Sequence, residues 1–136
     1  MARILIAEDD TGIRLLVARA LRLEGHEVLV AEDGEMAVDI LAEENGAFDL
    51  LLSDIRMPGM TGIELAHAAH ATFPALPILL MTGYAEQKEA AEDLSAFILG
   101  VVEKPFTIAE IRQRVAQALR GSAASAPDAT PLRRYA

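Results

Sequence analysis

The sequence predicts an α/β fold with a doubly wound parallel sheet. Five short apolar segments alternate along the chain with helical patterns, and this alternation is typical of a parallel sheet with crossover helices. Most of the segments lack a strict apolar–polar alternation, as expected for strands that are buried on both faces. Right-handed crossovers then place helices on both faces of the sheet. The five segments are residues 4–7, 28–31, 48–53, 77–82 and 97–102.

Helical patterns follow each of these segments. The first helix ends at Gly25, and the second runs from about 34 to 44 and ends near Asn45. Thr61 can cap a third helix, which closes before Pro74. The first helix is predicted from apolar residues at helical spacing, namely Ile13, Leu16, Val17, Ala20 and Leu21.

Two further helices complete the pattern. The fourth is expected over residues 85–94, where the apolar face is mostly alanine. The fifth begins with a capping box formed by Thr107 and Glu110. Its apolar stripe consists of Ile108, Ile111, Val115 and Ala118.

Length and composition predict one globular domain. The chain has 136 residues, of which 52% are hydrophobic and 24% are charged, enough to bury a single sizeable core. Residues 121–136 show no hydrophobic periodicity. We therefore expect a folded domain over residues 1–120 and a flexible tail over residues 121–136.

Composition also argues against several classes of protein. The net charge of -9 has the wrong sign for a nucleic-acid binder, and the apolar runs are far shorter than a membrane span. The N-terminus enters a strand at once, which leaves no room for a signal peptide. Without cysteine there is neither a disulfide framework nor a thiolate metal site. We expect a cytoplasmic protein that binds neither nucleic acid nor membranes.

Charged residues follow three of the predicted strands. Glu8, Asp9 and Asp10 follow the first strand, Asp54 ends the third, and Lys104 follows the last. The functional site of a doubly wound sheet lies beyond the carboxyl ends of its strands, so these side chains are expected to meet there. Asp9, Asp54 and a main-chain carbonyl just beyond Asp54 would offer the hard oxygen ligands that Mg²⁺ prefers.

This constellation predicts an aspartyl phosphate. Clustered carboxylates repel one another, which raises their pKa values until a cation neutralises them. With the metal bound, Asp54 can attack as a carboxylate nucleophile and form an acyl phosphate. Lys104 and the hydroxyl of Thr82, at the end of the fourth strand, would then stabilise the incoming phosphoryl charge.

Four motifs at these strand ends carry a family resemblance: Ala7-Glu8-Asp9-Asp10, Ser53-Asp54-Ile55-Arg56-Met57-Pro58-Gly59-Met60, Met81-Thr82-Gly83 and Glu103-Lys104-Pro105-Phe106. In this order they resemble the receiver domain of bacterial two-component response regulators, over residues 3 to about 119. The resemblance implies the flavodoxin-like (CheY-like) strand order 2-1-3-4-5. It also implies a signalling domain that catalyses only its own phosphorylation and dephosphorylation. The phosphoryl donor would be a histidine kinase or phosphotransferase, and the output a downstream protein partner.

The resemblance assigns a role to each charged residue. Asp54 would be the phospho-acceptor, with Thr82 as the switch hydroxyl and Lys104 as the lysine of the site. Asp10 is expected to be a neighbour and a helix cap. The implied Mg²⁺ ligands are Asp9, Asp54, the main-chain carbonyl of Arg56 and, through a water molecule, Glu8.

One position departs from the family pattern. Many receivers carry Tyr or Phe three positions before the lysine, and this ring moves inward when the threonine engages the phosphoryl group. This chain has Val101 there. Tyr84, two residues after Thr82, is a candidate substitute sensor.

The start Met-Ala-Arg-Ile-Leu-Ile-Ala-Glu-Asp-Asp, followed by Arg-Ala-Leu and Gly-His-Glu-Val, narrows the resemblance. It is similar to the CpdR type of stand-alone receivers in alphaproteobacteria, which implies a phosphorylation-controlled adaptor that directs substrates to a ClpXP protease. No room for an output domain is expected after the fifth helix. The family binds its partners on the face formed by the fourth helix, the fifth strand and the fifth helix.

Three alternatives compete with this interpretation. A Mg²⁺-dependent hydrolase acting through an aspartyl phosphate needs a second acid two residues after the nucleophile, where Arg56 stands. A nucleotide or flavin binder needs a Gly- or Ser/Thr-rich loop after the first strand, where three acids would repel phosphate. A docking module that works without phosphorylation stays open. His67 and His70 lack a third metal ligand and are expected to be exposed or half-buried.

Overall fold

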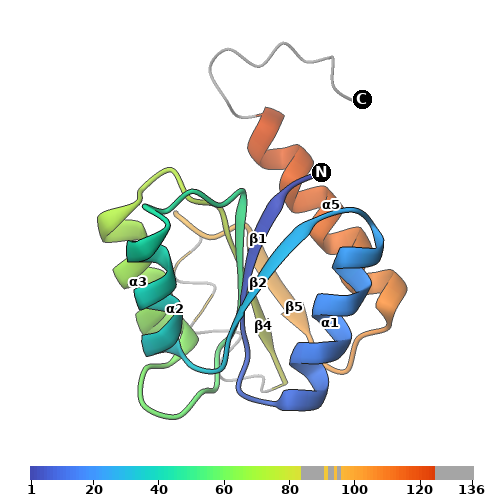
Figure 1. Cartoon of the computed structure of the whole chain (residues 1–136), viewed down its shortest axis with the longest axis horizontal. Coiled ribbons are helices and arrows are strands. Elements are labelled where there is room, and N and C mark those ends of the chain that lie inside the picture. The colour runs from blue at the N-terminus through green and yellow to red at the C-terminus, as the bar shows by residue number, and fades with distance from the viewer. Residues whose placement is uncertain (84–90, 92–93, 95, 125–136) are drawn as a thin grey trace.

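The computed structural model describes residues 1–83, 91, 94 and 96–124. They contain a five-stranded parallel sheet with the order β2-β1-β3-β4-β5, which confirms the predicted fold class (Figure 1). The third and fifth strands start later than the apolar runs suggest. The strands are β1 (Arg3–Ala7), β2 (Glu27–Ala31), β3 (Leu50–Asp54), β4 (Ile78–Thr82) and β5 (Gly100–Glu103).

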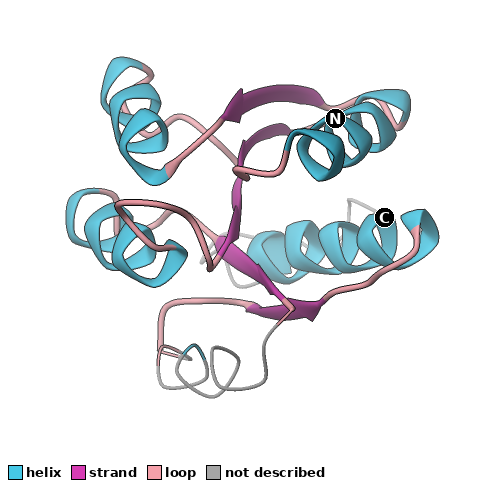
Figure 2. Ribbon diagram, turned by 90° about the horizontal axis from the view of Figure 1, so that it is seen from below, coloured by secondary structure: helices cyan, strands magenta, loops and turns pink. Residues whose placement is uncertain are grey.

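Helices cover both faces of the sheet (Figure 2). On one face lie α1 (Thr11–Leu23) and α5 (Ile108–Ala124), and on the other lie α2 (Gly34–Glu43) and α3 (Gly62–Thr72) (Figure 1). The helix expected over residues 85–94 lies largely outside the described residues. Among the helices that the structure describes, none is both long and apolar enough to cross a membrane.

Side-chain caps explain where the helices begin. Thr61 and Glu64 form a capping box at the start of α3, and Thr107 and Glu110 form another at the start of α5. The Asp10 side chain accepts a hydrogen bond from the main chain of the first turn of α1. Each cap satisfies N–H groups that the first turn leaves without a partner. The predicted capping residues are therefore confirmed.

Two apolar cores lie on the two faces of the sheet. Leu5, Leu51 and Leu80 pack into the core beneath α2 and α3, whereas Ile4 and Leu52 pack into the core beneath α1 and α5. Consecutive strand residues are thus both buried, one in each core. This explains why the strands lack the apolar–polar alternation of a one-sided sheet.

The predicted apolar stripe of α1 is wrong at one position. Helical spacing places Leu16 in the buried stripe, but its side chain is 51% exposed. The face of α1 that meets the sheet is centred on Val17 and Leu21. Close to the carboxyl end of β1, the buried residue is instead Arg14.

The apolar run over residues 97–102 predicts a strand that begins too early. The N–H groups of Phe97 and Ile98 both donate to the carbonyl of Leu94, at 2.9 and 3.0 Å, so this part of the chain is a turn. The strand β5 begins only at Gly100. Phe97 and Ile98 still contribute apolar side chains to the core beneath α3.

The last helix extends past the domain boundary predicted at residue 120. It continues to Ala124. Residues 125–136 lie outside the described residues, and the flexible tail stays a prediction.

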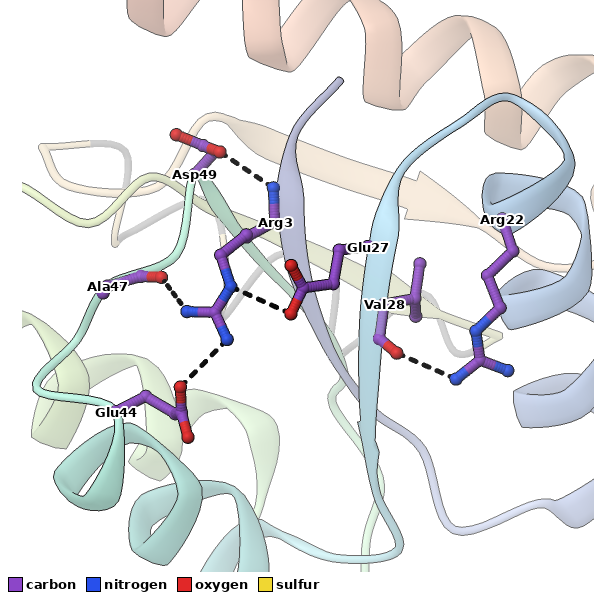
Figure 3. Close-up of polar contacts among 7 residues, drawn as sticks. All are labelled: Arg3, Arg22, Glu27, Val28, Glu44, Ala47 and Asp49. Atoms are coloured by element: carbon purple, nitrogen blue, oxygen red, sulfur yellow. Dashed lines mark hydrogen bonds and ion pairs between the residues drawn. The ribbon is translucent and has the colours of Figure 1, made fainter.

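An arginine network holds the amino ends of the strands together (Figure 3). The Arg3 guanidinium donates to the carboxylates of Glu27 at 3.2 Å and Glu44 at 2.9 Å, and to the carbonyl of Ala47 at 2.6 Å. The Arg3 main-chain N–H donates to the Asp49 carboxylate at 2.8 Å. These contacts join β1, β2, the end of α2 and the segment before β3. They lie at the edge of the sheet opposite to the carboxyl ends of the strands.

Candidate functional site

The carboxyl ends of neighbouring strands meet at one edge of the sheet. β1 pairs with β3, with Ala7 beside Ser53, and β3 pairs with β4, with Asp54 beside Met81. The acidic residues after β1 therefore start next to the end of β3. From β1 the chain continues to α1 on one face, and from β3 it continues to α3 on the other. Functional sites of doubly wound sheets form where connections diverge in this way.

The Lys104 ammonium connects two of the acidic side chains. Its Nζ lies 2.9 Å from Glu8 Oε1 and 3.0 Å from Asp54 Oδ1. Glu8 is fully buried, and Asp54 is 5% exposed. A second contact fixes Glu8, because its Oε2 accepts a hydrogen bond from the Asp10 N–H at 3.2 Å. The structure thus brings together residues at the carboxyl ends of β1, β3 and β5 that the sequence places far apart.

A set of three carboxylates could hold a cation. Glu8, Asp9 and Asp54 each offer an oxygen atom, and these atoms lie within 4.8 Å of one another. Asp9 is exposed, so the set opens to solvent on one side. Carboxylate oxygens in an open site fit Mg²⁺, which keeps several water molecules and takes one or two carboxylates. Arg56, whose carbonyl is the fourth predicted ligand, follows Asp54 in the loop after β3, and its side chain is exposed.

Burial and close charges shift the pKa values of this cluster. Burial raises the pKa of Glu8 to about 7, because the hydrogen bond from Lys104 only partly offsets burial and the Asp54 charge adds to it. Burial also raises the pKa of Asp54, against the opposing effect of Lys104. Burial lowers the pKa of Lys104, but hydrogen bonds and charges from Glu8 and Asp54 outweigh it and leave this pKa raised. Lys104 therefore stays charged at neutral pH.

Without Mg²⁺, the protein is expected to lose stability as the pH rises from 4.5, the ordinary pKa of Glu8, to about 7. In this range folded Glu8 keeps a proton that the unfolded chain has released, so the free energy of unfolding falls with pH. A pKa shift of this size corresponds to about 3 kcal/mol at most. Urea unfolding in EDTA, followed by circular dichroism at about pH 5 and about pH 7.5, measures the difference.

The variant Glu8→Gln is the control for this pH dependence. Glutamine keeps the size of the side chain but does not titrate, so the unfolding free energy of the variant should change less over the same range. An equal pH dependence in both proteins would assign the effect to groups other than Glu8.

Thr82 lies at the end of β4 beside the lysine. It is 2% exposed, and its carbonyl accepts a hydrogen bond from the Lys104 N–H at 2.7 Å. Val101, where many receivers have an aromatic ring, is half-buried and packs against the core beneath α3. Tyr84, the candidate substitute sensor, lies outside the described residues.

A glycine that the sequence reasoning missed allows α3 to approach Asp54. Gly62 is the first residue of α3, and its N–H donates to the Ile55 carbonyl at 2.8 Å. A Cβ atom on Gly62 would collide with the main-chain carbonyl of Asp54. The loop after Asp54 can therefore close tightly only with glycine at this position.

The two histidines of α3 lie away from the acidic cluster. His70 stacks on the Phe97 ring with centroids 4.3 Å apart, and His67 meets the same ring at 5.3 Å. His67 is exposed and His70 is half-buried, as predicted. Among the described residues, they take part in no group of three potential metal ligands.

Arg14 is another residue near the site that the sequence reasoning missed. It is 9% exposed, and its Nη1 donates to the carbonyl of Glu8 at 2.8 Å. An arginine on the sheet-facing side of an amphipathic helix, one turn after an acidic motif, is the signal that could have identified it.

Comparison with known proteins identifies the family of similar proteins. A family model described as the response regulator receiver domain matches residues 4–116. The response regulator receiver protein CpdR of Brucella abortus is 37% identical over 119 residues, which cover 88% of this chain and 98% of that protein. The response regulator protein FleR of Pseudomonas aeruginosa is 34% identical over 131 residues, but this chain spans only 27% of its length.

Solved structures show the same fold. A CheY-like response regulator receiver domain protein from Methanospirillum hungatei matches with a TM-score of 0.83 and 30% identity, over 93% of this chain and 99% of that one. The response regulator TrrA from Thermotoga maritima, solved in complex with Mg(2+)-BeF, matches with a TM-score of 0.76 and 32% identity, over 87% and 99% of the two chains.

Proposed function

Because the chain belongs to the family of response regulator receiver domains, we propose that it accepts a phosphoryl group on Asp54 in a Mg²⁺-dependent reaction. A histidine kinase or a phosphotransferase would donate the group. The observation that carries this proposal is the Lys104 ammonium, which lies 3.0 Å from Asp54 and 2.9 Å from Glu8 at the edge of the sheet where Asp9 also lies. A nucleophile, a cation for the phosphoryl charge and a set of metal ligands thus share one site.

The reaction is a displacement at phosphorus. An Asp54 carboxylate oxygen attacks the phosphorus atom, and the new O–P bond forms as the bond to the donor nitrogen breaks. The electron pair of the broken bond leaves with the donor imidazole. Lys104, which pairs with Asp54 beforehand, neutralises a phosphoryl oxygen afterwards, and the Thr82 hydroxyl donates to another. No other residue of the protein forms or breaks a covalent bond in this reaction.

The acidic set supports a role for Mg²⁺. When bound, the ion would neutralise the carboxylates and polarise the transferred phosphoryl group. Asp9, Asp54 and the Arg56 carbonyl would hold it directly, and Glu8 through a water molecule. The similarity to TrrA, which was solved with Mg(2+)-BeF, also favours this assignment.

Phosphorylation would act through a protein partner. The surface between β5 and α5 supports this role, because it contains a groove of about 420 Å³ with apolar and charged side chains. β5 joins this groove directly to Lys104, so a change at the site can reach it. Six of the residues that line the groove are Val101, Glu103, Phe106, Glu110, Arg114 and Gln117.

The similarity to CpdR extends over 98% of that protein and favours an adaptor that presents substrates to a ClpXP protease. The alternative of a hydrolase is less favoured, because Arg56 occupies the position where such enzymes need a second acid. Release of the phosphoryl group would therefore be slow and would serve to reset the signal.

Intact mass spectrometry after incubation with acetyl phosphate tests the proposal. The protein should gain one phosphoryl group with Mg²⁺ and none in EDTA, and hydroxylamine should remove the group because it cleaves acyl phosphates. A gain that is independent of Mg²⁺, or that resists hydroxylamine, would contradict the assignment. If neither acetyl phosphate nor a phosphorylated donor protein modifies the folded protein, the docking module that works without phosphorylation is the better interpretation.

A further inference from the structure

Arg14 is buried in a place where a positive charge is costly. Its side chain is 9% exposed, and it belongs to the first turns of α1 (Thr11–Leu23). Helical side chains lean toward the N-terminus, where the helix dipole is positive and disfavours a cation. Burying a guanidinium also costs free energy unless the surroundings compensate for it. The residue therefore needs an explanation beyond helix formation or packing.

The contacts of Arg14 point to the acidic motif. Nη1 donates to the main-chain carbonyl of Glu8 at 2.8 Å, and Nη2 donates to the Thr11 hydroxyl at 3.3 Å. Both acceptors are neutral, so these contacts form no ion pair. The two acceptors belong to Glu8 and Thr11, which lie on either side of Asp9 and Asp10 in the sequence.

The Glu8 carbonyl controls the position of Asp9. The peptide unit between the two residues is planar, so a hydrogen bond that fixes the Glu8 oxygen also fixes the N and Cα atoms of Asp9. On its other side, the Glu8 N–H donates to the Ala31 carbonyl of β2 at 3.1 Å. Arg14 and β2 thus hold the main chain just before Asp9 from two directions.

Asp9 depends on this main-chain support more than its neighbours do. The Glu8 and Asp54 carboxylates are held by Lys104. The Asp9 carboxylate is exposed, and within the described part of the chain it accepts no hydrogen bond. The main chain, which places the Cβ atom of Asp9, therefore determines where this carboxylate can reach a cation.

We propose that Arg14 is a positioning residue for Mg²⁺ binding, which acts by fixing the Glu8–Asp9 peptide and thereby the Asp9 carboxylate. This inference rests on the proposed Mg²⁺ site. For removal of Arg14, it predicts a change in Mg²⁺ affinity that is opposite to the change expected from charge repulsion alone. Removing a positive charge near a cation site should tighten cation binding, because like charges repel. Loss of a positioning contact should weaken it, by roughly tenfold for residues that support metal ligands.

The test is a titration of the full ¹⁵N-labelled chain with MgCl₂ at constant ionic strength, followed by ¹H–¹⁵N NMR spectra that report folding and affinity together. Arg14→Met is expected to bind Mg²⁺ roughly tenfold more weakly than the wild type. Arg14→Lys keeps the positive charge and can still donate a hydrogen bond, so its Mg²⁺ affinity should fall between those of Arg14→Met and the wild type. If Arg14→Met does not fold, the test uses Arg14→Lys. Unchanged or tighter binding in the folded variants would overturn the proposal.

Arg22→Met is the matched control. Arg22 is also on α1, and its guanidinium also donates to a main-chain carbonyl, that of Val28 at 2.8 Å, but near the amino ends of the strands (Figure 3). The control should lose stability without losing Mg²⁺ affinity. Weakening of the same size in Arg22→Met would overturn a positioning role for Arg14. If the wild type itself binds no Mg²⁺, the proposed function fails first and this inference fails with it.

Discussion

Asp54→Asn is expected to abolish phosphoryl uptake from acetyl phosphate, measured as the mass gain in the presence of Mg²⁺. The asparagine amide is nearly the same size as the carboxylate and can still accept a hydrogen bond from Lys104, but it is not a nucleophile toward phosphorus. The expected spectrum shows unmodified protein at times when the wild type is fully modified. A phosphoryl group on the variant would place the acceptor elsewhere.

The fold should survive this substitution. Burial raises the pKa of Asp54, and the charge of Asp9 adds to this shift, so removing the Asp54 charge relieves repulsion while it weakens the contact with Lys104. We expect the free energy of unfolding to change by about 1 kcal/mol or less. Asp10→Asn is the matched control. Asp10 caps α1, and asparagine caps helices as well as aspartate does, so this variant should be phosphorylated like the wild type.

Lys104→Met is expected to change the reaction rate and the metal affinity in opposite directions. Without the ammonium, the incoming phosphoryl oxygens lose the positive charge that Lys104 supplies, and uptake from acetyl phosphate should slow about a hundredfold. Mg²⁺ binding should become roughly thirtyfold tighter, because a single charge and a divalent ion about 4 Å apart repel each other by about 2 kcal/mol in a water-like medium. Mass spectrometry measures the rate, and NMR titration measures the affinity.

Lys104→Arg separates charge from geometry in this prediction. Arginine keeps the positive charge but presents it as a planar fork that does not replace the point charge of lysine. The Mg²⁺ affinity of Lys104→Arg should therefore stay near that of the wild type, whereas its phosphorylation should be slow, like that of Lys104→Met. If Lys104→Met instead binds Mg²⁺ more weakly, the lysine organises the carboxylates rather than repelling the cation.

The sequence contains enough to predict the architecture and the core of the site. Strands that are buried on both faces appear in the sequence as short continuous apolar runs. Because these strands are short, the positions of the residues directly after them can be predicted closely. Asp54 ends β3, and Lys104 comes directly after β5, so the rule that sites lie at the carboxyl ends of strands was enough to bring them together. The strand order itself came from the family resemblance rather than from hydrophobic patterns.

Residues whose role depends on main-chain contacts could not be predicted in this way. Gly62 is required because a carbonyl of β3 lies against α3, and Arg14 is buried because a carbonyl of the acidic motif accepts its hydrogen bond. Neither contact leaves a hydrophobic pattern. The exposed Leu16 shows the same limit, since helical spacing defines a stripe but not how far the stripe turns toward the sheet.

The Arg3 network has a consequence for how this protein can diversify. At that edge the carboxylates of Glu27, Glu44 and Asp49 each accept a hydrogen bond from Arg3. At the opposite edge, Lys104 pairs with Glu8 and Asp54, whereas within the described part of the chain the exposed Asp9 carboxylate accepts no hydrogen bond. The domain therefore has one closed end and one end whose charge remains available to ligands. Substitutions that retune signalling can accumulate at the second end while the first keeps the strands in register.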